Sequence, residues 1–320
     1  MKDSALRIVF MGTPDFALPS LQTLIDSAHD VVGVVTQPDR PRGRGLRVTA
    51  TPVKLFAKET GIPVLQPERL KDPAFHESLY AWEADLFVVV AFRILPMSVS
   101  CIPPEGAINL HASLLPKYRG AAPIQWAIVN GETETGVTTF FIEQKVDTGN
   151  ILRQQRFVIG PDETAGELYG RLMAKGAEVL RETVDLIAAG EARPIPQRGE
   201  ATPAPKLIKS DGLINWSVTT EAIHNRIRGL NPVPMAYTYR NGRTLRVISS
   251  RRCMDFPVSS GIPGEVIATD KQQGLIIRTG DGYLALTIVQ PEGKKRMIAD
   301  EYVRGYHIKP GDWLTSDQRS

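Results

Sequence analysis

Apolar residues in the first half of the chain fall into short runs, separated by stretches in which apolar positions recur at helical spacing. The runs are nearly continuous in Val, Ile, Leu and Phe, as expected for parallel strands covered on both faces. The predicted strands are 6–11, 30–37, 64–65, 86–92 and 107–110. The predicted helices between them lie at about 18–25, 51–61 and 72–83. This alternation predicts an α/β fold with an open, mostly parallel sheet.

The pattern continues with a helix after Pro123 and two further strands, at 136–143 and 150–159, with Asp147 in the turn between them. Thr164-x-x-Glu167 is a capping box that opens a long helix ending at Gly190. Residues 191–208 are rich in proline and isolated charges, which is typical of a linker.

Short β-rich segments separated by glycine-bearing turns follow the linker. They lie at 236–239, 244–249, 264–268, 274–278 and 283–290. Asn241-Gly242 and Asp281-Gly282 match tight hairpin turns. We therefore expect three parts, namely an α/β domain at 1–190, the linker at 191–208 and a small β-barrel domain at 209–320.

The overall composition does not change the predicted fold, but the distribution of charge bears on the function. The chain has 320 residues, of which 42% are hydrophobic and 23% charged, as in ordinary globular proteins. Residues 1–208 hold 22 basic against 24 acidic side chains, and residues 209–320 hold 16 against 11. The basic C-terminal part favours a polyanionic partner, although a solvated surface would look the same.

The sequence predicts a cytoplasmic protein without a membrane segment or a metal site. No basic stretch followed by an apolar signal core begins the chain, and no apolar run approaches membrane-spanning length. Cys101 and Cys253 lie far apart and form no Cys-x-x-Cys pair, so neither a disulfide framework nor a zinc site is indicated.

Asn109 and His111 are the strongest candidates for chemistry. They are two positions apart near the end of a predicted strand, so their side chains share one face. An amide and an imidazole can both donate hydrogen bonds to an oxyanion that develops at an acyl carbon. The alternative is that this polar face only hydrogen-bonds to neighbouring loops.

The residues around this pair resemble the active-site segment of the 10-formyltetrahydrofolate-dependent formyltransferases. The matching stretches are Asn109-Leu110-His111, Ser113-Leu114-Leu115-Pro116, Arg119-Gly120 and Asp147-Thr148-Gly149. Three further stretches narrow the resemblance to the methionyl-tRNA formyltransferases, namely 12–16, 36–41 and 120–125. The resemblance implies a Rossmann-like formyltransferase fold with a C-terminal OB-like β-barrel.

It also implies an activity and roles for residues. The formyl group of 10-formyltetrahydrofolate would be transferred to the free amino group of methionyl initiator tRNA, in translation initiation. Asn109 and His111 would stabilise the oxyanion. Asp147 would stabilise the charged form of His111 and could receive the proton of the amine, directly or through a water. No metal is needed.

The folate site implied by the resemblance is formed by two loops. Ser113, Leu114, Leu115 and Pro116 would border the formyl donor, and Ala91 and Phe92 would lie near its pterin. Many relatives have Ala-Tyr-Gly at the second loop. Here Ala91-Phe92-Arg93 leads almost at once into Ile94-Leu95-Pro96, so this loop is about one residue short.

Two basic clusters are expected to bind the tRNA. Arg40, Arg42, Arg44 and Arg47 lie in a Gly/Pro-rich loop that we expect to be flexible and suited to phosphate contacts. Lys294, Lys295 and Arg296 in the barrel domain could add a second patch. We expect the chain to act as a monomer.

Three other functions are alternatives to this one. A nicotinamide enzyme would need Gly-x-Gly-x-x-Gly after the first strand, where only Gly12 is found. A formyltransferase for a small amine, such as a sugar nucleotide, would need neither the arginine loop nor a basic barrel. An RNA-binding protein without the chemistry would not need Asn109, His111 and Asp147.

Overall fold

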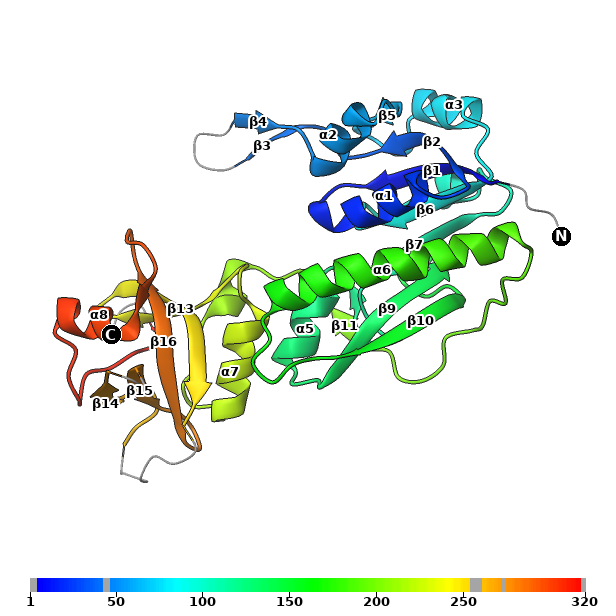
Figure 1. Ribbon diagram of the computed structural model, residues 1–320. Helices are drawn as coiled ribbons and strands as arrows, with labels where there is room; N and C mark the ends of the chain where they lie inside the picture. Colours follow the sequence, from blue (N-terminus) through cyan, green and yellow to red (C-terminus); the bar gives the residue numbers. More distant parts are fainter. Residues whose placement is uncertain (1–4, 43–46, 254–260, 272–273, 318–320) are drawn as a thin grey trace. The chain divides into compact units, whose positions relative to one another are not determined.

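The computed structural model describes residues 5–42, 47–253, 261–271 and 274–317. The chain forms two compact units (Figure 1). The first comprises residues 1–123, 135–157 and 169–204, and the second comprises 124–134, 158–168 and 205–320.

The first unit is built on a seven-stranded sheet with the order β10-β9-β7-β6-β1-β2-β5. Its strands are β1 (Arg7–Gly12), β2 (Asp30–Val35), β5 (Val64–Leu65), β6 (Leu86–Val90), β7 (Ala107–His111), β9 (Glu134–Phe141) and β10 (Ile151–Val158). The five strands from β5 to β7 are parallel, and β9 runs antiparallel to β7. Every residue of β6 is buried, as its unbroken apolar sequence predicts. The predicted α/β class is confirmed.

Helices flank this sheet (Figure 1). They are α1 (Leu18–Ile25), α2 (Pro52–Glu59), α3 (Pro73–Ala81), the short α4 (Met97–Ser100) and most of α6 (Ala165–Ala188), with a 3-10 turn η1 (Asp15–Ala17). Apart from Pro123, α5 (Pro123–Val129) belongs to the second unit. Thr51 caps α2, because its hydroxyl accepts from Lys54 N at 3.1 Å. The capping box is confirmed, since Thr164 N donates to the Glu167 carboxylate at 2.8 Å and Glu167 N donates to the Thr164 hydroxyl at 3.3 Å.

The predicted loop of arginines contains a small hairpin at its base. β3 (Arg40–Arg42) and β4 (Arg47–Thr49) pair antiparallel, with Arg40 opposite Thr49 and Arg42 opposite Arg47. Backbone pairing therefore orders the base of a segment whose proline and glycine content had favoured a flexible loop. The tip, residues 43–46, lies outside the described residues.

The chain after α6 returns along the first unit without forming a helix. Ile195 makes a bridge with Ile151, and β11 (Pro203–Ala204) pairs parallel with β8 (Arg119–Gly120). The first unit extends to Ala204, and the second resumes at Pro205.

The second unit contains an antiparallel sheet with the order β12-β13-β16-β15-β14, and β17 pairs with β16. The strands are β12 (Ala236–Arg240), β13 (Arg243–Arg252), β14 (Val266–Asp270), β15 (Gly274–Arg278), β16 (Tyr283–Pro291) and β17 (Met297–Ile298). Trp313 bridges to Glu265 beside β14, and Thr315 bridges to Tyr239 in β12. The backbone near 313–315 thus connects the two edges, as the expected barrel requires.

The two predicted hairpin turns of this sheet differ. Asn241 and Gly242 both have positive φ angles, 48° and 71°, and form the expected two-residue turn between β12 and β13. Asp281-Gly282 belongs to a four-residue connection instead, closed by a hydrogen bond from Thr279 N to Gly282 O.

Helices α7 (Thr220–Gly229) and α8 (Ala299–Tyr306), with the 3-10 turn η2 (Lys209–Gly212), complete the second unit. The sequence did not predict α8. Its Ala299 and Tyr302 are buried in the core of this unit, so packing supports a helix that is only two turns long.

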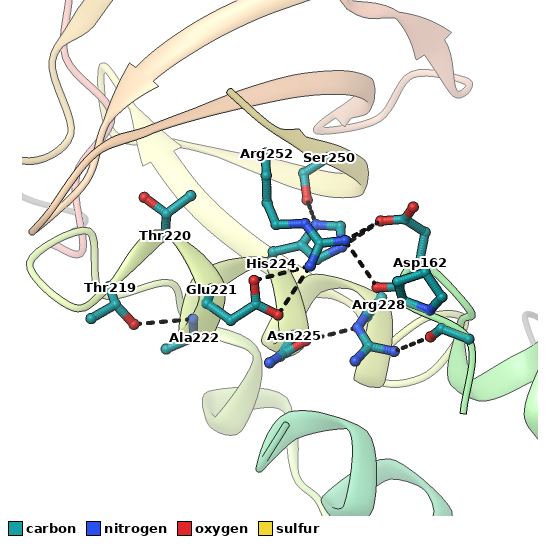
Figure 2. A network of polar contacts seen from close by, with 12 residues as sticks. Asp162, Thr219, Thr220, Glu221, Ala222, His224, Asn225, Arg228, Ser250 and Arg252 are labelled. Atoms are coloured by element: carbon teal, nitrogen blue, oxygen red, sulfur yellow. Dashed lines mark hydrogen bonds and ion pairs between the residues drawn. The ribbon is translucent and has the colours of Figure 1, made fainter. Parts of the chain in front are cut away.

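A polar network ties α7 and β13 to residues 160–163, which precede α6 in the chain (Figure 2). Arg252 contacts both Glu221 and Asp162 at 3.0 Å. Arg228 donates to the carbonyl oxygens of Gly160 and Glu163. His224 Nε2 lies 3.0 Å from Asp162 Oδ1, and the His224 side chain is only 3% exposed. Charged groups on three segments thereby hold one another within the second unit.

Candidate active site

Asn109 and His111 lie near the carboxyl end of β7, where the ends of three parallel strands meet. Gly12 of β1 is level with Val90 of β6, and Val90 is level with Leu110 of β7. The turn after β6, which begins at Ala91, therefore comes beside His111. The carboxyl edge of a parallel sheet is where α/β proteins place their ligands.

Asn109 is half-buried, and its side chain shares a strand face with His111. Within the part of the chain that the structure describes, no group hydrogen-bonds to the Asn109 amide. The amide can therefore bind a ligand atom without first breaking a hydrogen bond within the described protein.

His111 is buried, with 7% of its surface exposed, and its two ring nitrogens face different groups. Nε2 lies 2.8 Å from the carbonyl oxygen of Tyr118. A carbonyl can only accept, so Nε2 carries a proton and donates it. Nδ1 is then the nitrogen that gains a proton when the ring becomes charged, and it lies 3.8 Å from Asp147 Oδ2.

Asp147 lies in the turn between β9 and β10, as predicted, and is 9% exposed. Its backbone is left-handed, with a φ of 55°. Oδ2 accepts a hydrogen bond from Gly120 N at 2.8 Å and is the oxygen nearest to His111. The 3.8 Å separation from Nδ1 exceeds a hydrogen bond, so a third polar atom placed beside them could contact both groups.

The structure thus brings together Asn109, His111 and Asp147 from β7 and the turn after β9. Sequence reasoning did not identify the backbone groups of Tyr118 and Gly120 that orient them, because backbone donors and acceptors leave no signal in residue type. It also missed the side chain of Gln197, which hydrogen-bonds to the carbonyl oxygens of Asp147 and Gly149.

The loop from Ser113 to Pro116 follows β7 and is held in place by hydrogen bonds to Thr138 on β9. Thr138 accepts a hydrogen bond from Leu115 N and donates to Ser113 O at 2.6 Å. Ser113 is fully buried and Leu115 is 3% exposed. Of the four folate contacts predicted in this loop, only Leu114 and Pro116 are partly exposed. Ser113 and Leu115 therefore offer almost no surface to a ligand, and their hydrogen-bonded backbone fixes the course of the loop.

The second predicted folate loop begins with a left-handed residue, since Ala91 has a φ of 49°. Phe92 is half-buried and packs against the core, and the Arg93 guanidinium stacks over its ring at 5.3 Å from the ring centre. Arg93 also donates to the carbonyl oxygens of Pro67 and Glu68. Burial lowers the pKa of Arg93 from its ordinary value. These contacts give the short loop a defined conformation.

The basic residues predicted to bind tRNA lie apart from this cluster in sequence. Arg40 is exposed and forms an ion pair with Glu68. Arg42 and Arg47 stand on β3 and β4, whereas Arg44 lies outside the described residues. Lys294, Lys295 and Arg296 are exposed between β16 and β17.

The described residues hold neither a candidate metal site nor a candidate membrane span. In that part of the chain, His, Cys, Asp and Glu side chains form no group of three or more that could hold a metal ion. None of the helices described has the length and apolar character that a membrane span requires.

Two family descriptions match the chain. "Formyl transferase" matches residues 6–184, and "Formyl transferase, C-terminal domain" matches residues 206–307.

The relatives found include proteins named methionyl-tRNA formyltransferase. That of Moorella thermoacetica is 47% identical over 311 residues, covering 97% of this chain and 99% of the relative. That of Bacteroides thetaiotaomicron is 41% identical over 321 residues, with 97% and 99% covered.

Solved structures extend the similarity at lower identity. WlaRD, described as a sugar 3N-formyl transferase, superimposes with a TM-score of 0.66 at 23% identity, covering 91% of this chain and 100% of WlaRD. HypX from Aquifex aeolicus, solved with tetrahydrofolic acid, gives 0.65 at 17% identity. This chain is covered to 98% in that match but spans only 51% of HypX. At such identities the likeness concerns the fold.

Proposed function

The chain belongs to the formyl transferase family, and we propose that it transfers a formyl group from 10-formyltetrahydrofolate to the amino group of methionyl-tRNA. The observation that carries this proposal is the cluster of Asn109, His111 and Asp147 at the carboxyl edge of the sheet. The choice of acceptor is supported by relatives of that name, which align with 97% of this chain.

The folate supplies the formyl carbon and, at N10, the group that leaves it. The protein must stabilise negative charge on the formyl oxygen while the amine attacks. The Asn109 amide can donate one hydrogen bond to this oxygen, and charged His111 can donate another from Nδ1, because Nε2 is already engaged by Tyr118 O. Both donors come from one strand, so their spacing is fixed before the substrates bind.

Asp147 has two roles in this proposal. Its carboxylate faces Nδ1 of His111 and favours the charged imidazolium by electrostatic attraction. It can also receive the proton that the methionyl amine releases, directly or through a water. Gly120 N holds the carboxylate at 2.8 Å, which leaves the other oxygen, Oδ1, available for the proton.

For the folate we propose the two loops at the same edge of the sheet. Leu114 and Pro116 offer accessible surface, whereas Ser113 and Leu115 are buried and fix the course of the loop through their hydrogen bonds to Thr138. The left-handed turn at Ala91 with Phe92 lies beside β7 by register. Apolar surface is thus available for the ring system of the folate.

For the tRNA we propose the arginine hairpin and the patch formed by Lys294, Lys295 and Arg296. Arginine forks and lysine ammonium groups both bind phosphate oxygens, and Lys294, Lys295 and Arg296 are exposed. Arg40 would have to exchange its ion pair with Glu68 for a phosphate. The proposed acceptor is the initiator tRNA, the proposed active form is a monomer and the proposed compartment is the cytoplasm.

A comparison of acceptors tests this proposal. The purified protein is incubated with 10-formyltetrahydrofolate and one of three amines, namely methionyl-tRNA, an amino-sugar nucleotide or glycinamide ribonucleotide. Mass spectrometry then detects the formylated product. We expect a product with methionyl-tRNA alone. Formylation of only a small amine would favour the second candidate function, a formyltransferase that acts on small amines. WlaRD, described as a sugar 3N-formyl transferase, shares the fold of this chain.

A further inference from the structure

Gln197, in the connection after α6, lies against the turn that carries Asp147. Its Nε2 donates two hydrogen bonds, to Asp147 O at 3.0 Å and to Gly149 O at 2.9 Å. Its Oε1 accepts from Arg119, with Nη2 at 2.6 Å and Nε at 3.3 Å. Carbonyl groups only accept and guanidinium groups only donate, so these partners fix the direction of the amide.

The turn that Gln197 holds is conformationally demanding. Asp147 adopts the left-handed region, which a residue with a β-carbon retains only when its surroundings impose it. At Gly149 a β-carbon would come 1.7 Å from Phe141 O, so the turn also passes very close to the end of β9. The two carbonyls bound by Gln197 flank Thr148, and one amide therefore spans the turn.

The residues after Gln197 hold the opposite side of the cluster. Thr202 accepts from Arg119 N at 2.9 Å through its carbonyl and from Tyr118 N at 2.9 Å through its hydroxyl. Gly120 passes so near β11 that a β-carbon on it would lie 2.6 Å from Ala204 O. Tyr118 O and Gly120 N are the groups that contact His111 and Asp147. The segment from residue 197 to 204 thus holds both the turn that carries Asp147 and the backbone of Tyr118 and Gly120.

We propose that Gln197 is a positioning residue that sets the Asp147 carboxylate relative to His111. This inference rests on the proposed function, because it requires Asp147 to act in the transfer. Gln197 contacts neither reactant in the proposal. Misplacement of a catalytic group by about 1 Å can reduce the rate roughly 100-fold, so loss of the amide affects turnover more than substrate binding.

The first test replaces the amide with an unbranched thioether side chain of similar length, which cannot donate a hydrogen bond. Gln197→Met should lower kcat by about 10- to 100-fold, while the KM values for both substrates change by less than about 2-fold. The control is Gln155→Met on β10, where the parent side chain is exposed, and it should keep the parent kcat. A Gln197→Met protein with the parent kcat would overturn the inference.

Gln197→Glu is the second variant, and it keeps an acceptor for Arg119 while it loses both donors to the turn. We expect it to lose turnover as Gln197→Met does. If Gln197→Glu retained the parent kcat, the hydrogen bond to Arg119 alone would explain the role of Gln197. The proposed action of Gln197 on Asp147 would then be wrong.

The decisive readout is the pairing of Gln197→Met with Asp147→Asn. Because Gln197 acts through Asp147, the double variant should be no slower than Asp147→Asn alone. Multiplied losses would show that Gln197 acts independently of Asp147 and would refute the inference. An impaired Asp147→Asn beside a fully active Gln197→Met refutes the inference only. A fully active Asp147→Asn refutes the role of Asp147 in the proposed function as well.

Discussion

His111 has one ring nitrogen committed to the protein and one facing the carboxylate of Asp147. Nε2 donates to Tyr118 O at 2.8 Å, and Nδ1 faces Asp147 Oδ2 at 3.8 Å. The only proton that His111 can offer to a substrate is therefore the one on Nδ1, and it is present only in the charged ring. The Asn109 amide needs no protonation to donate.

Removal of either donor should reduce turnover strongly. We expect Asn109→Ala and His111→Ala each to lower kcat at least about 100-fold, because loss of one oxyanion donor typically costs roughly 100- to 1000-fold. Steady-state kinetics measures the loss, and circular dichroism checks the fold. His76→Ala, a histidine on α3, is the control and should keep the parent turnover. Near-normal turnover in both site variants would contradict the assignment.

The residues of the candidate site differ in how far the sequence predicts them. The shared face of Asn109 and His111 follows from strand periodicity alone. The approach of Asp147 to His111 depends on the pairing of β7 with β9, and the sequence indicates it only through the family motif. Gln197 stands in a proline-rich stretch without periodicity, so no local pattern marks it as part of the site.

At the scale of elements, the β3–β4 hairpin is anchored at its base. Asp39, just before β3, accepts hydrogen bonds from Lys54 and Gln66. The hydrogen bond from Lys54 lowers the pKa of Asp39 from its ordinary value. Arg40 pairs with Glu68. These contacts hold the start of the hairpin in place.

The hairpin should act on the tRNA and leave the folate unaffected. Arg42→Ala combined with Arg44→Ala should raise the KM for methionyl-tRNA and flatten its dependence on salt, because fewer counterions are released on binding. Kinetics at several salt concentrations measures both effects, and the KM for 10-formyltetrahydrofolate should stay unchanged. Loss of the same charge on α6, by Lys175→Ala with Arg181→Ala, is the control. An unchanged salt dependence would make the hairpin an ordinary solvated surface.

Most elements were predictable, and the exceptions have physical causes. The buried strands and capped helices carry strong local signals, and they appear within a few residues of their predicted bounds. β3 and β4 were missed because three-residue strands among prolines and glycines have no periodicity. α8 was missed because two turns are too short for a clear pattern and depend on packing with the barrel core.

At the scale of the whole molecule, the two compact units do not follow the chain in order. Residues 124–134 and 158–168 belong to the second unit although they lie within the region matched by the first family description. Long-range packing decides this division, for example through Arg228, which binds the carbonyls of Gly160 and Glu163. Periodicity is local and carries no information about such contacts.

The same network makes stability depend on pH. Burial lowers the pKa of His224, Arg252 and Arg228 lower it further, and Asp162 and Glu221 oppose this effect. Ser250 hydrogen-bonds to its Nδ1 at 3.0 Å. Below the ordinary histidine pKa of about 6.5, the unfolded chain therefore takes up a proton that folded His224 does not. This residue's contribution to stability should fall as the pH decreases through that range.

His224→Asn removes the titrating group and leaves an amide near Ser250. The variant should lose less thermal stability than the parent between pH 7.5 and 5.5, measured by tryptophan fluorescence at both pH values. His307→Asn is the control, because His307 is exposed and left-handed, a conformation that asparagine tolerates. It should keep the acid sensitivity of the parent. Equal sensitivity in all three proteins would exclude His224 as the cause.

Single-turnover formylation of methionyl-tRNA is the most direct test of the proposed formyl transfer. Excess protein is mixed with 10-formyltetrahydrofolate carrying a labelled formyl group and with methionine-charged initiator or elongator tRNA, and label on the methionyl amine is followed in time. We expect transfer that requires the folate and is faster for the initiator tRNA. If no label reaches either methionyl-tRNA while the folded protein formylates a small amine, the proposed function is wrong.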